Sequence, residues 1–339
     1  MAVQKRNGIQ SIFLALDKRP NLFWRILLYL CGVFVLLLVS PVLAKLILFG
    51  LLSSLPSVVQ DLFLNGLYML LNVLGVLGWT YLFRRYVDKR PWRGIALTPL
   101  RRGLPLALLG FVLGGFLMGL VFVIDYALGW IHIVGTEFSI SGITVGIGFV
   151  IANLLGGSII PGFTEELAFR GYTFQNLGER FPLWLAVLIT GVLFGLFHIT
   201  HFGEGSVFAI LSFVGLAILF TLLMVMCRLS TQSLWLAIGL HTGWDWFLND
   251  VLGLGVADSP SHALLHIKTT GPAIMVGAAP FPTESGLVAL LVLVLGIVVI
   301  ALWARYRNRD FFWQARLTDE GQVQAADPVS EVTAIGSFR

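Results

Sequence analysis

The sequence predicts an all-α protein, a polytopic transmembrane helix bundle of about eight membrane helices. Hydrophobic residues make up 57% of the 339 positions and charged residues only 12%, whereas a soluble domain is about half apolar and about a quarter charged. The mean hydropathy is +0.89. Apolar runs of roughly 20 residues, the length of a membrane-spanning helix, recur along the chain. Strand-like alternation of apolar and polar residues is absent, which argues against a membrane barrel.

The apolar runs divide the chain. They predict membrane helices at about residues 22–52, 62–83, 104–130, 143–177, 182–200, 206–227, 233–254 and 286–303. Pro41 is expected to bend or end the first of these. The predicted parts are an amphipathic cytoplasmic lead-in (1–21), helices 1–3 (22–142), a core of helices 4–7 (143–254), an extracytoplasmic loop (255–283), helix 8 (284–304) and a cytoplasmic tail (305–339). From about Thr318 this tail is polar with mixed charge, a composition typical of disorder.

Basic residues predict the orientation of the helices. The loop after helix 2 carries seven Lys or Arg residues against one acid, Asp88. Eight crossings place this loop, both termini and the other basic clusters on one side, which the positive-inside rule assigns to the cytoplasm. We therefore expect an integral protein of the cell (plasma) membrane with both termini cytoplasmic.

Other classes of protein are less compatible with the composition. Cys31 and Cys227 lie in or at the end of apolar runs, so a disulfide framework or a thiolate metal site is not expected. The net charge of +4 is explained by basic clusters beside membrane helices and does not indicate a nucleic-acid partner. The expected partners are the lipid bilayer and a peptide or protein substrate at the membrane.

Charged residues interrupt helix 4. Glu165, Glu166 and Arg170 follow a long apolar run, and charges near hydrocarbon cost roughly 2.5–3.5 kcal/mol each. Glu166 and Arg170 are four residues apart and share a helix face, so they are expected to pair. Glu165 points elsewhere and is a candidate general base. The structural alternative is an ion-pair cluster at the membrane edge.

Two histidine motifs follow in later helices. His198 stands near the end of helix 5, with His201 three residues on as a structural candidate. His241 and Asp245 are four apart on one face of helix 7, so the acid is expected to orient the imidazole or to bind a substrate carbonyl with it. The structural alternative is that these polar groups only satisfy one another inside the bundle.

These residue types point to hydrolysis of a buried bond, which needs an activated water and donors for the developing oxyanion. The chain lacks His-Glu-x-x-His and Gly-x-Ser-x-Gly, so a zincin helix and a serine nucleophile elbow are not indicated. Two alternatives remain open: a water activated by Glu and His with no metal, or a Zn²⁺ ion held by His198, His241 and Glu165.

Helices 4 and 5 pose a geometric problem. Crossing the membrane straight, they would leave Glu165 near one face and His198 near the other. A long hairpin turning at Phe181 and Pro182 would instead bring the two residues opposite each other. We favour the hairpin, with helix 4 broken at the Gly and Pro residues of 156–162, because irregular backbone is tolerated where it lines a protein-buried cavity.

Together the three motifs resemble those of the CPBP family of intramembrane proteases, which includes the type II CAAX prenyl endopeptidases and bacteriocin-processing or immunity proteins. The family pattern is Glu-Glu-x-x-x-Arg, Phe-x-x-x-His and His-x-x-x-Asn/Asp. Here these are Glu165-Glu166 with Arg170, Phe194 with His198, and His241 with Asp245. The resemblance covers about residues 143–250. The third motif has Asp where the prenyl endopeptidases tend to have Asn.

The resemblance implies an intramembrane endopeptidase, a hydrolase of the CAAX prenyl protease type, either glutamate-dependent or a metalloprotease. Glu165 and His198 would activate water. His241 and Asp245 would bind the oxyanion or substrate carbonyl, although orienting His241 suits an acid at 245 better. Glu166 and Arg170 would support them. The substrate would be membrane-associated, including prenylated or lipidated proteins. A non-proteolytic scaffold or immunity protein of the same fold is the alternative; a proton-coupled transporter fits less well without an evident repeat.

Overall fold

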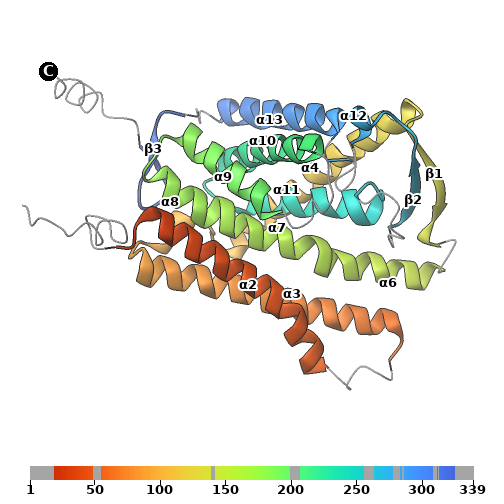
Figure 1. Cartoon of the computed structure of the whole chain (residues 1–339), viewed down its shortest axis with the longest axis horizontal. Helices are drawn as coiled ribbons and strands as arrows, with labels where there is room; N and C mark the ends of the chain where they lie inside the picture. The colour runs from red at the N-terminus through yellow and green to blue at the C-terminus, as the bar shows by residue number, and fades with distance from the viewer. Residues whose placement is uncertain are drawn as a thin grey trace, which may run out of the picture.

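Long apolar helices, several of them preceded by proline, account for most of the structure (Figure 1). The computed structural model describes residues 19–48, 55–138, 142–198, 207–255, 263–277, 283–284, 286–307, 311 and 313–324. The main helical elements are α2 (Leu22–Leu48), α3 (Ser57–Leu82) with the π-helical turn η1 (Phe83–Val87), α4 (Leu100–Ala127), α6 (Ile143–Asn153), η3 (Leu154–Ser158), α7 (Ile159–Glu165), η4 (Glu166–Thr173), α8 (Phe174–Gly178), α9 (Leu183–Phe197), α10 (Val207–Thr231), α11 (Trp235–Asp245), η6 (Trp246–Val251) and α13 (Leu287–Tyr306).

The helices confirm the predicted all-α, polytopic membrane bundle. Within the described residues six helices are long and apolar enough to cross a membrane, and α9 is a shorter apolar helix. The predicted seventh helix appears as α11 followed by the π-helical η6. Pro41 does not end α2, which continues to Leu48. The lead-in up to residue 18 and the tail from 325 lie outside the described residues.

The break expected in helix 4 takes another form. From α6 to α8 the helix runs on without a gap, and two π-helical stretches, η3 and η4, replace the predicted break. Pro161 has no N–H to donate to Gly157, four residues earlier, so regular α-helical bonding is interrupted there. The chain then turns at residues 179–182 and returns as α9, which is the hairpin favoured from the sequence.

Helix α11 is held against α4 by glycine. Gly239 and Gly243 on α11 face the carbonyls of Ala107 and Phe111, and Gly110 and Gly114 on α4 face the backbone of α11 in turn. Small residues at this four-residue spacing let membrane helices approach closely. The contact is backbone to backbone, so it fixes the position of the helix that carries His241 and Asp245.

We expect Gly239→Ala to lower the free energy of unfolding by about 1–3 kcal/mol, because its Cβ would overlap the carbonyl of Ala107. Unfolding in mixed detergent micelles measures the change. Gly215→Ala on α10 is the matched control, since a Cβ there meets nothing within 4 Å. Equal stability of the two variants would contradict the close contact.

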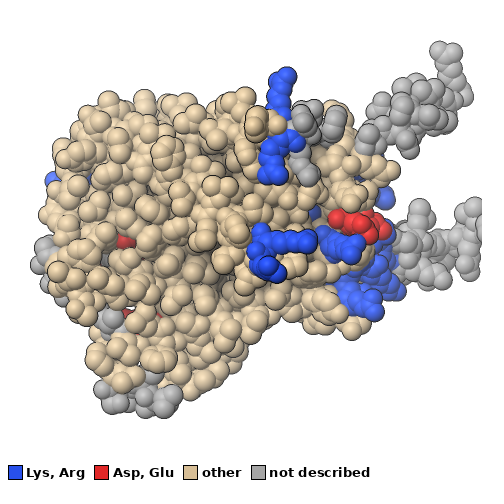
Figure 2. Space-filling view, turned by 180° about the vertical axis from the view of Figure 1, so that it is seen from behind, with Lys and Arg blue, Asp and Glu red and all other residues tan. Residues whose placement is uncertain are grey.

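The two ends of the bundle differ in chemistry. At one end β1 (Ile131–Thr136) pairs antiparallel with β2 (Leu265–Thr269), a ribbon the sequence did not predict in the 255–283 loop. Figure 2 shows the exposed Lys and Arg residues of the visible face gathered toward the opposite end, which we call the basic end. The start of α2 and the end of α13 both lie at the basic end (Figure 1). Its assignment to the cytoplasm stays a prediction.

A buried charge network closes the basic end. Asp88, the lone acid of the basic loop, is fully buried and accepts hydrogen bonds from Arg25 (3.0 Å), Tyr172 (3.1 Å) and Asn176 (3.2 Å). Burial of a carboxylate is tolerated when it is paired and hydrogen-bonded in this way. The network ties α2, η4 and α8 to the loop after α3.

The segment after α13 also packs on this end. Strands β3 (Arg316–Leu317) and β4 (Val323–Gln324) form a small hairpin, with Leu317 buried. The carbonyls of Ala315 and Trp313 accept the N–H groups of Leu183 and Trp184, donors that the start of α9 would otherwise leave unsatisfied. The disorder predicted from Thr318 onward is therefore wrong for residues 318–324. Polar composition alone does not reveal this capping contact.

Candidate active site

Backbone geometry separates the two adjacent carboxylates. Helix α7 ends at Glu165, and the π-helical η4 begins at Glu166. Such turns are frequent at functional sites. Glu166 has no exposed surface, whereas the Glu165 side chain is 11% exposed and lines a cavity. The two adjacent acids therefore have different surroundings, and their separate roles stay a prediction.

A close contact between helices places Glu165 opposite α11. Gly162, one turn before Glu165, lies against Thr242, where a Cβ would overlap the threonine hydroxyl. Glycine at this position therefore allows α7 to approach α11 beside His241. A larger residue would push the two histidine- and acid-bearing helices apart.

Arg170 is the buried cation of the site. Its guanidinium donates to Glu166 Oε1 at 2.7 Å and to Thr221 at 2.8 Å, and both charged side chains are fully buried. It also lies 4.2 Å from the ring centroid of Phe194, a favourable cation–π distance. The carboxylate of Glu166, 2.7 Å away, balances the positive charge of Arg170.

Glu166 also holds His241. The Nδ1 atom of His241 lies 2.9 Å from Glu166 Oε1, so Nδ1–H donates to the carboxylate. The Nε2 atom faces Asp245 Oδ2 at 3.4 Å and Glu165 Oε2 at 4.0 Å. The imidazole is thus oriented by Glu166 rather than by Asp245, which lies on the opposite side of the ring.

His198 reaches the same carboxylate from α9. Its Nδ1–H donates to the carbonyl of Phe194 at 2.9 Å, and its Nε2 lies 3.8 Å from Glu165 Oε2. Phe194 therefore serves twice, through its carbonyl to His198 and through its ring to Arg170. Separations of 3.8 and 4.0 Å between Glu165 and the two imidazoles are the kind that a water bridges.

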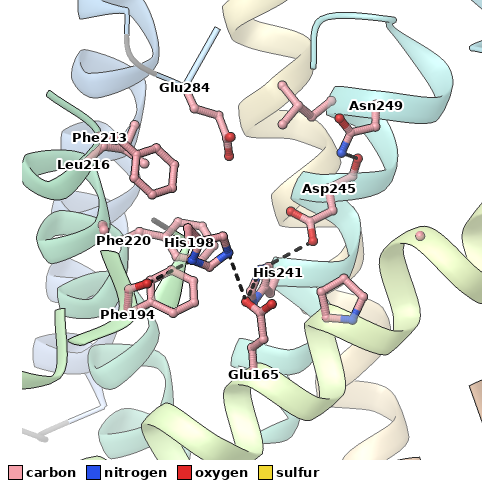
Figure 3. A pocket seen from close by; sticks show the side chains of 14 residues that line it. Glu165, Phe194, His198, Phe213, Leu216, Phe220, His241, Asp245, Asn249 and Glu284 are labelled. Atoms are coloured by element: carbon pink, nitrogen blue, oxygen red, sulfur yellow. Dashed lines mark hydrogen bonds and ion pairs between the residues drawn. The ribbon is translucent and has the colours of Figure 1, made fainter. Parts of the chain in front are cut away.

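Two cavities meet at Glu165 and His198. The first, of about 290 Å³, contains the predicted residues Glu165, His198, His241 and Asp245 (Figure 3). The second, of about 450 Å³, is more apolar and extends between α2, α3 and α7; it is lined by residues including Phe34, Leu37, Leu38 and Tyr68. The proposed water-activating pair thus stands between a polar chamber and an apolar one.

The side chains do not form a ready-made zinc site. In the described part of the chain, no group of three or more His, Cys, Asp or Glu residues is arranged to hold a metal ion. Tetrahedral zinc at about 2 Å from each ligand would bring ligand atoms to roughly 3.3 Å from one another. The distances from Glu165 to His198 and His241 are 3.8 and 4.0 Å.

The sequence located most of the site but not all of it. Six predicted residues, Glu165, Glu166, Arg170, His198, His241 and Asp245, converge, although His241 and Glu166 are 75 positions apart. His201 lies outside the described residues. Glu284 was missed: it lines the cavity from the turn before α13, where Trp244 donates to it at 3.3 Å. Its only sequence signal is a single acid just before an apolar run.

Carboxylates and imidazoles surround an interior cavity in a bundle with six candidate membrane-spanning helices among the described residues, an arrangement compatible with an intramembrane hydrolase. Residues 146–247 match the family model described as type II CAAX prenyl endopeptidase Rce1-like. The match confirms the predicted resemblance to the CPBP intramembrane proteases over these core helices, about a third of the chain. It supports CAAX-type endopeptidase activity in general, on a peptide or protein substrate at the membrane. No curated protein matches the chain.

Proposed function

We propose that the protein is an intramembrane endopeptidase in which Glu165 and His198 activate a water molecule to cleave a membrane-associated peptide. One observation carries the proposal: the Nε2 atoms of His198 and His241 both face the same Glu165 oxygen, at 3.8 and 4.0 Å, in a cavity within the bundle. A base and two imidazoles facing one cavity supply the proton acceptor and the donors that amide hydrolysis requires.

The chemistry balances with these residues alone. Glu165 takes a proton from the water as the water oxygen bonds to the scissile carbonyl carbon. With Nδ1–H held by Glu166, a proton on His241 Nε2 is directed into the cavity and donates to the developing oxyanion. Glu165 then delivers its proton to the leaving nitrogen as the C–N bond breaks. Asp245, 3.4 Å from Nε2, shares that donor with the substrate.

The apolar cavity supports a lipid-like or hydrophobic substrate portion. It is lined by side chains of α2, among them Phe34 and Leu38, and reaches Glu165 and His198. An apolar chain bound there would bring the adjoining peptide bond to the two catalytic groups, and fixing that geometry lowers the barrier.

We expect the purified, detergent-solubilised protein to cleave peptides with an apolar tail, and to retain its rate after treatment with EDTA or 1,10-phenanthroline. The reason is that Glu165 and His198 supply the base and orienting group without a metal. Fragment release followed by mass spectrometry measures the reaction.

The cleavage assay tests the proposed activity, and its response to chelators tests the metal-free mechanism. Absence of fragments above buffer with every apolar-tailed peptide would overturn the proposed activity. Cleavage that stops on chelation and returns with Zn²⁺ would overturn the metal-free mechanism while leaving the endopeptidase.

A further inference from the structure

The polar cavity is lined by more acidic than basic side chains. Its lining includes the carboxylates of Glu165, Asp245 and Glu284, and no Lys or Arg side chain of the described residues lines it. The nearby cation, Arg170, is paired with Glu166. With all three carboxylates ionised, protonating both His198 and His241 would still leave one net negative charge.

Glu284 approaches this space from the side opposite Glu165. Figure 3 shows its carboxylate directed into the cavity from above, with Asp245 to one side and Glu165 below. Trp244 Nε1–H donates to Glu284 Oε1 at 3.3 Å, which fixes the side chain in place. The catalytic steps above use neither Glu284 nor its tryptophan partner.

One buried acceptor in this cavity lacks a donor among the described residues. Glu165, 9% exposed, has a buried Oε2 atom with no hydrogen-bond donor. Burial raises the pKa of Glu284, whereas the hydrogen bond from Trp244 and the imidazoles of His198 and His241 lower it, and the Glu165 carboxylate raises it. Carboxylates gathered in a poorly solvated space repel one another unless a cation enters.

We propose that this cavity selects peptides carrying a basic side chain next to the scissile bond, with Glu284 as the residue that recognises the charge. This specificity rests on the proposed endopeptidase function. A substrate ammonium or guanidinium would satisfy Glu284 and Asp245 together, whereas a carboxylate at the same place would be repelled.

The geometry also fixes the side on which the basic residue lies. Along α11, Asp245 is one turn beyond His241, about 6 Å, toward the end where the carbonyl of Asp250 accepts Leu264 N–H beside β2. Helix α13, which follows Glu284 in the chain, begins near the same end (Figure 1). The basic group therefore lies on the part of the substrate that points toward the β1–β2 ribbon.

Binding of three matched peptides tests the proposal. They are apolar, fluorescently labelled and identical except for one central residue, Lys, Gln or Glu. Binding to the full-length chain in detergent is measured by anisotropy in a Glu165→Gln background, which prevents turnover. We expect the Lys peptide to bind about tenfold more tightly than the Gln peptide, and the Glu peptide more weakly still, as for a close charge pair.

Added substitutions assign the effect to one side chain. Glu284→Gln is expected to reduce the preference for Lys to less than about threefold, and Glu284→Asp to restore most of it, since one lost or regained charge sets the difference. Glu320→Gln, which removes an exposed acid from the C-terminal hairpin, is the matched control and keeps the preference. Restoration by Asp separates charge recognition from a folding defect.

Equal affinity for the three peptides, no measurable binding of any, or a preference unchanged by Glu284→Gln would each overturn the inference. Failure here is distinct from failure of the proposed function. Cleavage by the wild-type protein without charge preference defeats only the specificity, and charge-selective binding without cleavage defeats only the enzymatic activity.

Discussion

Glu165→Gln is expected to slow peptide cleavage by roughly a hundred- to ten-thousandfold, the usual contribution of a general base. Glutamine is nearly isosteric but cannot take a proton from the water between Glu165 and His198. Because Glu165 Oε2 accepts no hydrogen bond, the substitution breaks none there. Initial rates for wild type and variant, on the same apolar-tailed peptide in the same detergent, give the ratio.

Glu320→Gln is the control for a lost acid, because that side chain is exposed and remote from the cavity. It is expected to cleave at the wild-type rate. If the Glu165→Gln protein, unfolding at the wild-type temperature, cleaved as fast as wild type, Glu165 could not be the base. The alternative of a non-proteolytic scaffold predicts that neither protein cleaves.

The second large effect is on stability: Arg170→Met should lower the free energy of unfolding by about 3–5 kcal/mol. Removing Arg170 leaves Glu166 buried with no counter-charge except His241, and it also removes the donor to Thr221 and the cation over Phe194. Detergent-mixture unfolding curves of the purified variants measure the loss.

A double substitution separates the charge from the packing. The double variant Glu166→Gln/Arg170→Met removes both members of the ion pair, so neither is left as an unpaired buried charge. Most of the stability lost in Arg170→Met should therefore return. A double variant at least as unstable as the sum of the two singles would show that the ion pair is not what makes Arg170 indispensable. A change below about 1 kcal/mol for Arg170→Met would contradict its full burial.

The helices were predictable because each depends on local composition. An apolar run of membrane length forms a helix almost wherever the chain places it. The meeting of Glu165 and His198 was also predictable, since both lie equally far from the turn at Phe181 and Pro182. Their common partner, His241, was a candidate because it shares one face of an apolar helix with Asp245, although no spacing along the chain implies its distance from Glu165.

What the sequence did not reveal depends on contacts between distant segments. Glu284 reaches the cavity because the turn before α13 lies beside Trp244 of α11, which donates a hydrogen bond to it. The ribbon of β1 and β2 joins strands more than 120 positions apart, pairing Ile131 with Thr269. Ala315 caps α9 through its carbonyl, a group that every residue has and that side-chain patterns do not mark.

The glycine contact between α4 and α11 has a consequence for how a substrate enters. With main chain against main chain at Gly239 and Gly243, the helix that carries His241 and Asp245 has no intervening side chains whose rotation would let it move relative to α4. We therefore expect a substrate to enter through the apolar cavity, which side chains such as Phe34 and Leu38 of α2 border. On this view the pair α4 and α11 holds His241 and Asp245 in place, and the movement that admits a substrate is expected in α2.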